Sequence, residues 1–156
     1  MTTNVFKYSL GGALLLVALI AAAVYFIAPP REATAMPGHI TGSTSYPSEG
    51  TPAEIVCAEP VHGGASTCVE TPGQGLTPEA GDTTYDLKLV PGDYYVYAKV
   101  KDPASLGSDL GGYKAYYTTF VTCGEQFSCK DHAKIPVTVV GGQTVSGIDP
   151  ADWYMP

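Results

Sequence analysis

Basic residues are scarce in this chain, and beyond residue 35 it contains no arginine. Residues 36–156 hold six lysines against 14 acidic residues, which gives this part a formal charge of −8. Such a charge repels phosphates, and the basic face that polyanion binding requires is absent. The sequence therefore predicts no nucleic-acid partner. A cationic or metal-bearing partner stays open, although the same charge also keeps an exported domain soluble.

Catalytic and metal-binding motifs are also lacking. There is no G-x-S-x-G nucleophile elbow and no D-x-D-x-D calcium loop. Residues 128–132 bring a serine, a cysteine, an aspartate and a histidine together, but adjacent residues cannot orient one another as nucleophile, base and orienting acid. We therefore expect a protein that is not an enzyme and has no metal site and no cofactor.

Two aspartates near the C-terminus allow two interpretations. Asp149 and Asp152, helped by Asp131, could supply carboxylates to a calcium ion, but calcium takes six to eight oxygen ligands. The interpretation that we favour is a capped helical turn with Asp149 as its N-cap and Pro150 at its first position. The sequence alone leaves cation binding at Asp149 and Asp152 undecided.

The one long apolar run is residues 10–28, which carry no charge and are long enough to cross a bilayer as a helix. Lys7 precedes the run, so we expect residues 1–9 in the cytoplasm and the rest of the chain outside it. The competing interpretation is a signal peptide, because Pro29 and Pro30 are followed by an A-x-A cleavage motif ending at Ala35. The length favours a retained single-pass anchor, with residues 29–37 as a proline-containing tether.

Four cysteines follow the apolar run. An even number in an oxidising compartment indicates disulfides, and the short spacings favour Cys57 with Cys68 and Cys123 with Cys129. Spacings of 11 and 6 do not match the short gaps of zinc knuckles.

Residues 38–156 read as short strands separated by Gly, Pro, Asp or Ser, with no long amphipathic helix. The alternation of Tyr85, Leu87 and Leu89 with polar neighbours predicts a strand with one buried face. We expect residues 90–93 to turn the chain so that the next strand pairs back, and Gly141–Gly142 to form a two-residue hairpin. The expected strands are 39–46, 53–59, 67–70, 83–90, 94–101, 113–122, 134–140 and 143–148. Seven or eight strands predict an all-β sandwich.

The run 38–42 (GHITG) leading into 45–53 (SYPSEGTPA), followed by 85–87 (YDL) and 90–98 (VPGDYYVYA), resembles the carboxypeptidase regulatory-like domains. The resemblance implies their transthyretin-like (prealbumin-like) seven-stranded β-sandwich. Residues 147–154, together with 123–132, are similar to small bacterial exported members of this group. Such domains are attached to many kinds of protein, so the resemblance implies no enzymatic role.

Tyrosine is in excess, and several tyrosines fall on two neighbouring expected strands. If Tyr95, Tyr97 and Tyr116 face outward, they form a candidate binding face for an envelope protein or glycan. The alternative is a structural ladder of cross-strand aromatic pairs. The sequence thus predicts a membrane-anchored, extracytoplasmic β-sandwich of the cell envelope that binds or scaffolds. Its alternatives are a carbohydrate-binding module using these tyrosines, and a secreted soluble domain cleaved near Ala35.

Overall fold

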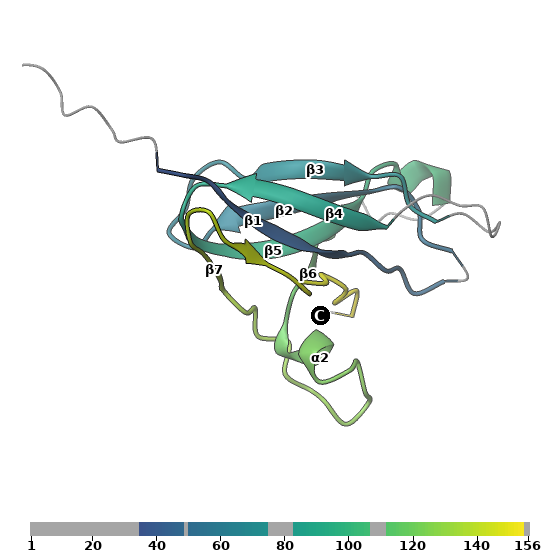
Figure 1. The fold of residues 1–156 in the computed structure, drawn as a ribbon. Helices are drawn as coiled ribbons and strands as arrows, with labels where there is room; N and C mark the ends of the chain where they lie inside the picture. Colours follow the sequence, from purple (N-terminus) through teal and green to yellow (C-terminus); the bar gives the residue numbers. More distant parts are fainter. Residues whose placement is uncertain (1–34, 49, 75–82, 107–111, 155–156) are drawn as a thin grey trace, which may run out of the picture. The chain divides into compact units, whose positions relative to one another are not determined.

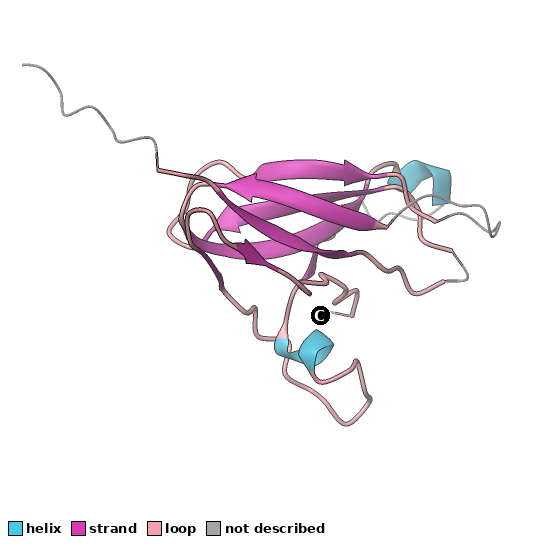
Figure 2. Ribbon diagram, in the orientation of Figure 1, coloured by secondary structure: helices cyan, strands magenta, loops and turns pink. Residues whose placement is uncertain are grey.

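The computed structural model describes residues 35–48, 50–74, 83–106 and 112–154. In this part of the chain, eight strands form two sheets (Figure 1), and helix is limited to two short turns (Figure 2). The elements are β1 (Gly38–Ser43), β2 (Glu54–Pro60), β3 (Thr67–Thr71), β4 (Thr84–Leu89), β5 (Gly92–Val100), η1 (Pro103–Leu106), β6 (Ala115–Tyr116), α2 (Thr119–Thr122), β7 (Val137–Val139) and β8 (Thr144–Val145). The expected all-β architecture is confirmed at this level.

The smaller sheet has the strand order β4-β1-β8, with β1 antiparallel to β4 and parallel to β8. The larger sheet has the order β3-β2-β5-β6. Strand β7 pairs with the start of β5, beside the residues that pair with β6. Every pairing in the larger sheet is antiparallel.

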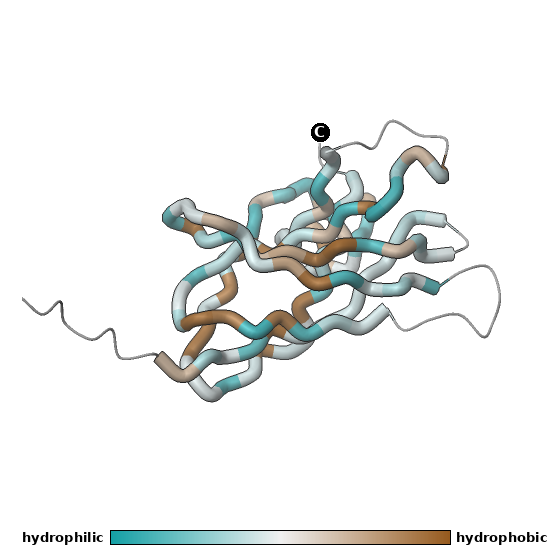
Figure 3. Tube along the Cα trace, turned by 90° about the horizontal axis from the view of Figure 1, so that it is seen from above, coloured by the Kyte–Doolittle hydropathy of each residue, from teal (hydrophilic) through white to brown (hydrophobic). Residues whose placement is uncertain are grey.

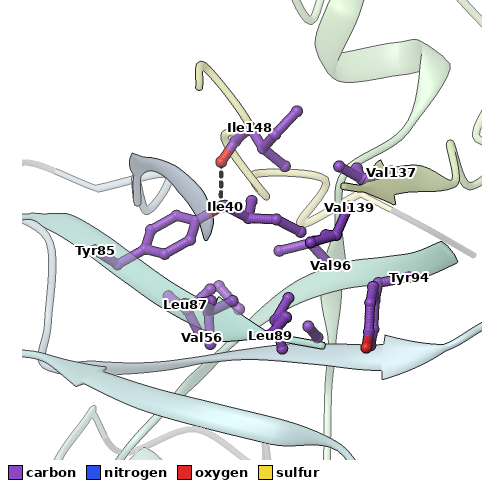
Figure 4. Packing of buried hydrophobic residues seen from close by; sticks show 12 residues of the cluster. Ile40, Val56, Tyr85, Leu87, Leu89, Tyr94, Val96, Val137, Val139 and Ile148 are labelled. Atoms are coloured by element: carbon purple, nitrogen blue, oxygen red, sulfur yellow. Dashed lines mark hydrogen bonds between the residues drawn. The ribbon is translucent and has the colours of Figure 1, made fainter. Parts of the chain in front are cut away.

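The core lies between the two sheets and follows from the two-residue period of the strands. Tyr85, Leu87 and Leu89 point inward from β4, as the sequence predicts, and meet Val56 and Val96 of the larger sheet (Figure 4). The Tyr85 hydroxyl donates a hydrogen bond to the carbonyl of Ile148 inside this core, and burial raises the Tyr85 pKa well above its usual value. Along the chain, short hydrophobic stretches are separated by hydrophilic and neutral residues (Figure 3).

The two expected hairpins are wrong in their pairing. The turn at 90–93 carries the chain from β4 in the smaller sheet to β5 in the larger one, and Gly141–Gly142 lead from β7 to β8, again between sheets. Turn residues specify a chain reversal, but an arch between two sheets uses the same residues and the same inward alternation as a hairpin. The sequence pattern therefore located the strands without identifying their partners.

The expected strand 113–122 is only partly present. Its β-branched and aromatic residues form the two-residue strand β6, then the chain turns into α2. Tertiary packing overrides the strand propensity here, because the helical turn places Phe120 against His132 and Tyr154. This departure forms one wall of the candidate site.

The predicted cytoplasmic segment 1–9, the predicted span 10–28 and most of the predicted tether 29–37 lie outside the described residues. Within the described residues, no helix has the length and apolar character needed to span a bilayer.

Candidate binding site

A pocket of about 320 Å³ lies beside α2, between the loop that follows this helix and the end of the described chain. Three aromatic residues, Phe120, Phe127 and Tyr154, contribute to its lining. The remaining lining residues are Glu125, Cys129, Lys130 and His132. The pocket therefore combines apolar surface with groups of both charges.

A short disulfide-closed loop shapes one side of this pocket. The helix α2 ends at Thr122, with Cys123 as its C-cap. The backbone amides of Gly124 and Glu125 donate hydrogen bonds to the carbonyls of Val121 and Phe120 at 2.9 and 3.0 Å. Gly124 and Glu125 both have left-handed backbone, with φ of 83° and 54°. Such a conformation is uncommon for a residue with a side chain, and here it reverses the chain directly after the helix.

The Cys123–Cys129 disulfide closes this loop over a separation of six residues. The second disulfide joins Cys57 to Cys68, which are direct cross-strand partners in β2 and β3. Both predicted pairings are confirmed. The Cys123–Cys129 bridge limits the motion of the loop that carries Phe127.

One lining residue of the pocket, His132, belongs to a polar network that continues into the protein. Asp152 is fully buried, and its Oδ2 accepts a hydrogen bond from the Thr118 hydroxyl at 2.7 Å. The same oxygen lies 2.8 Å from Nδ1 of His132. A carboxylate accepts rather than donates, so Nδ1 carries a proton and Nε2 of a neutral ring is left as an acceptor. The amide of Asp152 also bonds to the Tyr116 carbonyl, which fixes the end of the chain to β6.

The aromatic residues extend from this network to the surface. The Phe120 ring stacks on His132 at a centroid distance of 4.7 Å and meets Tyr154 edge-on at 5.8 Å. Phe127 is 90% exposed and Tyr154 is 56% exposed. Nζ of Lys130 lies 3.8 Å from the centroid of Phe127, a cation-π contact. The pocket thus combines exposed aromatic surface with His132, whose hydrogen bond ties it to the buried Asp152.

Glu125 adds a carboxylate to the rim. Partial burial raises its pKa above the usual value, and the negative charge of Asp152 raises it further. Among the described residues, no cation lies within ion-pair distance of Glu125. This rim carboxylate is therefore available to a hydrogen-bond donor on a ligand.

The predicted tyrosine face lies elsewhere, on the outer side of the larger sheet. Tyr95, Tyr97 and Tyr116 are on the face away from the core, as the alternation predicts, but Tyr97 and Tyr116 are only 5% and 7% exposed. Their rings lie 5.3 Å apart and pack with Cys57, and only Tyr95 is half-buried. The expectation of three exposed tyrosines is therefore wrong for two of them.

Lysine side chains cover these two tyrosines. Nζ of Lys114 lies 4.1 Å from the Tyr97 centroid, and Nζ of Lys134 lies 3.6 Å from the Tyr116 centroid. Lys114 also donates to Glu59 at 2.9 Å, a hydrogen bond that holds the Glu59 pKa below its usual value. Because a lysine lies over each ring and both rings are nearly buried, the arrangement favours the structural ladder and leaves little aromatic surface for a sugar.

The aspartates proposed for a capped turn or a cation have other roles. The capped helical turn is wrong, because the chain is not helical at Asp149 and this residue instead accepts hydrogen bonds from the Ser43 amide and hydroxyl at 2.7 and 3.2 Å. Asp131 accepts a bond from the amide of Ala133. Within the described residues, no group of three or more His, Cys, Asp or Glu side chains could hold a metal ion.

The sequence interpretation missed the contacts of Thr118, His132 and Asp152, which are up to 34 residues apart and share no motif. It also missed Glu54, a fully buried glutamate at the start of β2. The only signal in the sequence for a buried glutamate was that Glu54 shares the inward face of the expected strand 53–59 with Val56. Comparisons of this chain with protein families, curated proteins and solved structures found no match.

Proposed function

We propose that this chain is a membrane-anchored, extracytoplasmic β-sandwich of the cell envelope that binds a partner without catalysing a reaction. The observation that carries the proposal is the pocket beside α2, where Phe127 and Tyr154 expose aromatic surface next to His132, which is held by the buried Asp152. Exposed aromatic side chains on a rigid support are typical of binding surfaces, because they bring large apolar area at low entropic cost.

The chemistry of the pocket supports binding over catalysis. An Asp–His pair can orient a general base, but Cys129 in the lining is held in a disulfide and so is no nucleophile. The ammonium of Lys130 lies against the Phe127 ring. The rest of the lining is aromatic apart from Glu125, which suits recognition of a ligand with both apolar and polar parts.

The anchor and the family are parts of the same proposal. The uncharged run 10–28 supports a retained single-pass span with the domain outside the cytoplasm, and the 38–42 and 90–98 motifs support a transthyretin-like sandwich of the carboxypeptidase regulatory-like type. Alkaline carbonate extraction of membranes, followed by sequencing of the mature N-terminus, tests the anchor. We expect an intact N-terminus in the membrane pellet, whereas a soluble product beginning near Met36 would establish the secreted alternative.

A carbohydrate ligand is the second candidate function. Burial of Tyr97 and Tyr116 disfavours the tyrosine face for this role, but the pocket offers aromatic rings beside Glu125 and His132. Glycan arrays probed with the full chain and with Phe127→Ser separate the two functions. We expect no glycan signal that depends on Phe127; such a signal would favour the carbohydrate-binding function.

A further inference from the structure

One end of the sandwich is formed by segments that contain no charged residue. Four segments meet there: residues 35–38 leading into β1, 60–66 between β2 and β3, 89–92 between β4 and β5, and 139–143 between β7 and β8. The strand registers place them together, since Gly38 pairs with Leu89, Pro60 with Tyr94 and Gly92 with Val139. None of these segments contains Asp, Glu, Lys or Arg, although residues 36–156 hold 20 such residues.

Apolar side chains are exposed at this uncharged end. Met36, Val90 and Val140 are 69%, 64% and 47% exposed, and they are half of the exposed large apolar residues in the described chain. The segments that bear them touch. The amide of Gly142 donates to the Pro37 carbonyl at 2.9 Å, and a Cβ placed on Gly141 would lie 2.6 Å from the Met36 carbonyl oxygen and 3.5 Å from the Pro91 ring.

The carboxylates closest in sequence to this end are already occupied. Asp93 accepts a hydrogen bond from the Thr138 hydroxyl at 2.6 Å, and Glu59 accepts one from Nζ of Lys114 at 2.9 Å. The exposed Lys88, which directly precedes Leu89, carries a positive charge. The end is therefore apolar, uncharged and built from turns, in a domain that is otherwise strongly acidic. Moving such a surface out of water costs little free energy, and its segments contain no acidic residue that would repel an anionic surface.

The covalent chain sets an upper limit on the distance between the uncharged end and the proposed anchor. Eight residue steps join Ala28 at the end of the apolar run to Met36, and an extended chain of this length spans at most about 29 Å. The headgroup layer that such a tether must first cross is roughly 5 to 7 Å thick. Met36 therefore lies within reach of the lipid surface whenever the anchor is in the bilayer.

We infer that the uncharged end docks on the lipid bilayer, with Met36, Val90 and Val140 entering the headgroup region. This inference rests on the proposed membrane anchor. Docking buries the apolar residues and turns the acidic remainder of the domain away from anionic headgroups. Because three side chains supply limited apolar area, the contact orients an anchored domain and does not replace the anchor.

Tryptophan quenching by brominated lipid tests the inference on the full chain. The chain is reconstituted in phosphatidylcholine vesicles with and without dibrominated acyl chains, as wild type, Val90→Trp and Leu106→Trp. Leu106 is the matched control, because it is also exposed but lies on η1, which follows β5 at the other end of that strand. Trp153, present in all three proteins, supplies the common background and packs near Ser45 and Tyr46.

We expect the added fluorescence of Val90→Trp to fall at least twofold in brominated vesicles and to shift to shorter wavelength, and that of Leu106→Trp to stay within about 10% of its value in ordinary vesicles. Vesicle flotation measures anchoring separately. A chain that floats with the vesicles but shows equal quenching at both positions overturns the docking and leaves the anchor intact. A chain that does not float overturns both.

Discussion

Glu54 on β2 lies directly across from Thr71 on β3, and neither the two carboxylate oxygens nor the threonine hydroxyl has a hydrogen-bond partner among the described residues. Both side chains are buried. The nearby Thr44 hydroxyl donates to the carbonyl of Thr83 at 3.5 Å instead. Burial dominates and raises the pKa of Glu54 to about 7.

The raised pKa makes the free energy of unfolding depend on pH. As pH rises above the ordinary value of 4.5, Glu54 releases its proton first in the unfolded chain, while the folded state keeps it up to about pH 7. Stability is therefore greatest below pH 4.5 as far as this group is concerned, falls between pH 4.5 and 7, and stays reduced above. The loss amounts to about 3 kcal/mol at most.

Glu54→Gln should remove this dependence and stabilise the protein above pH 7, because the neutral amide has no charge to bury. Urea unfolding of the wild type and the variant at pH 4.5, 6 and 8 measures the difference. Glu70→Gln is the control, since Glu70 is exposed and pairs with Lys101 at the surface. Equal pH profiles for wild type and Glu54→Gln would contradict the assignment.

Asp152→Ala should lower the free energy of unfolding by roughly 2 to 3 kcal/mol, because it leaves the Thr118 hydroxyl and Nδ1 of His132 without their acceptor. Asp131→Ala, which removes only an exposed bond to the Ala133 amide, should cost far less. Chemical denaturation of both variants provides the comparison. Similar costs for the two would show that the buried network does not hold the end of the chain.

Tyr97→Ser should destabilise the protein by about 3 kcal/mol or more, comparable to Leu87→Ala, because both side chains are almost fully buried. Tyr95→Ser should cost clearly less, since Tyr95 is half-buried. Thermal unfolding of the three variants tests the ladder. A Tyr97→Ser protein with wild-type stability would restore the predicted role of this face in binding.

Replacing Cys123 and Cys129 together by Ser should lower the free energy of unfolding by about 2 kcal/mol, as expected for a loop of this length. The main effect should be local, because the bridge closes only the loop that carries Phe127. Hydrogen exchange should speed up in residues 123–130 and change little in β2 and β5. Faster exchange throughout both sheets would contradict this local role.

The strands and the inward positions of β4 and β5 were predictable, because a two-residue period and turn residues are local features of the sequence. Both disulfides were also predictable from short spacings in a chain expected to be exported. The pairing of β4 and β7 was not, since a turn does not reveal whether the next strand joins the same sheet. The burial of Tyr97 and Tyr116 depends on Lys114 and Lys134, which no periodicity places over those rings.

The pocket could not be predicted from the sequence for a related reason. The network that holds His132 in its lining joins Thr118, His132 and Asp152 across the chain, and its aromatic wall forms only because an expected strand turns into α2. The sequence did predict the bridge between Cys123 and Cys129, which locates the loop. It did not predict that the loop exposes Phe127 beside a pocket. Long-range contacts of this kind follow from the fold and not from a motif.

The most direct test of the proposed binding function is site-specific photo-crosslinking of the full chain in cells. A photoreactive phenylalanine replaces Phe127, whose exposed ring tolerates the change, and the same group at Leu106 is the exposed control. We predict a discrete adduct at position 127 that is absent at position 106 and is lost when Tyr154→Ser is added. The same adducts at both positions, or no adduct at 127, would contradict the account.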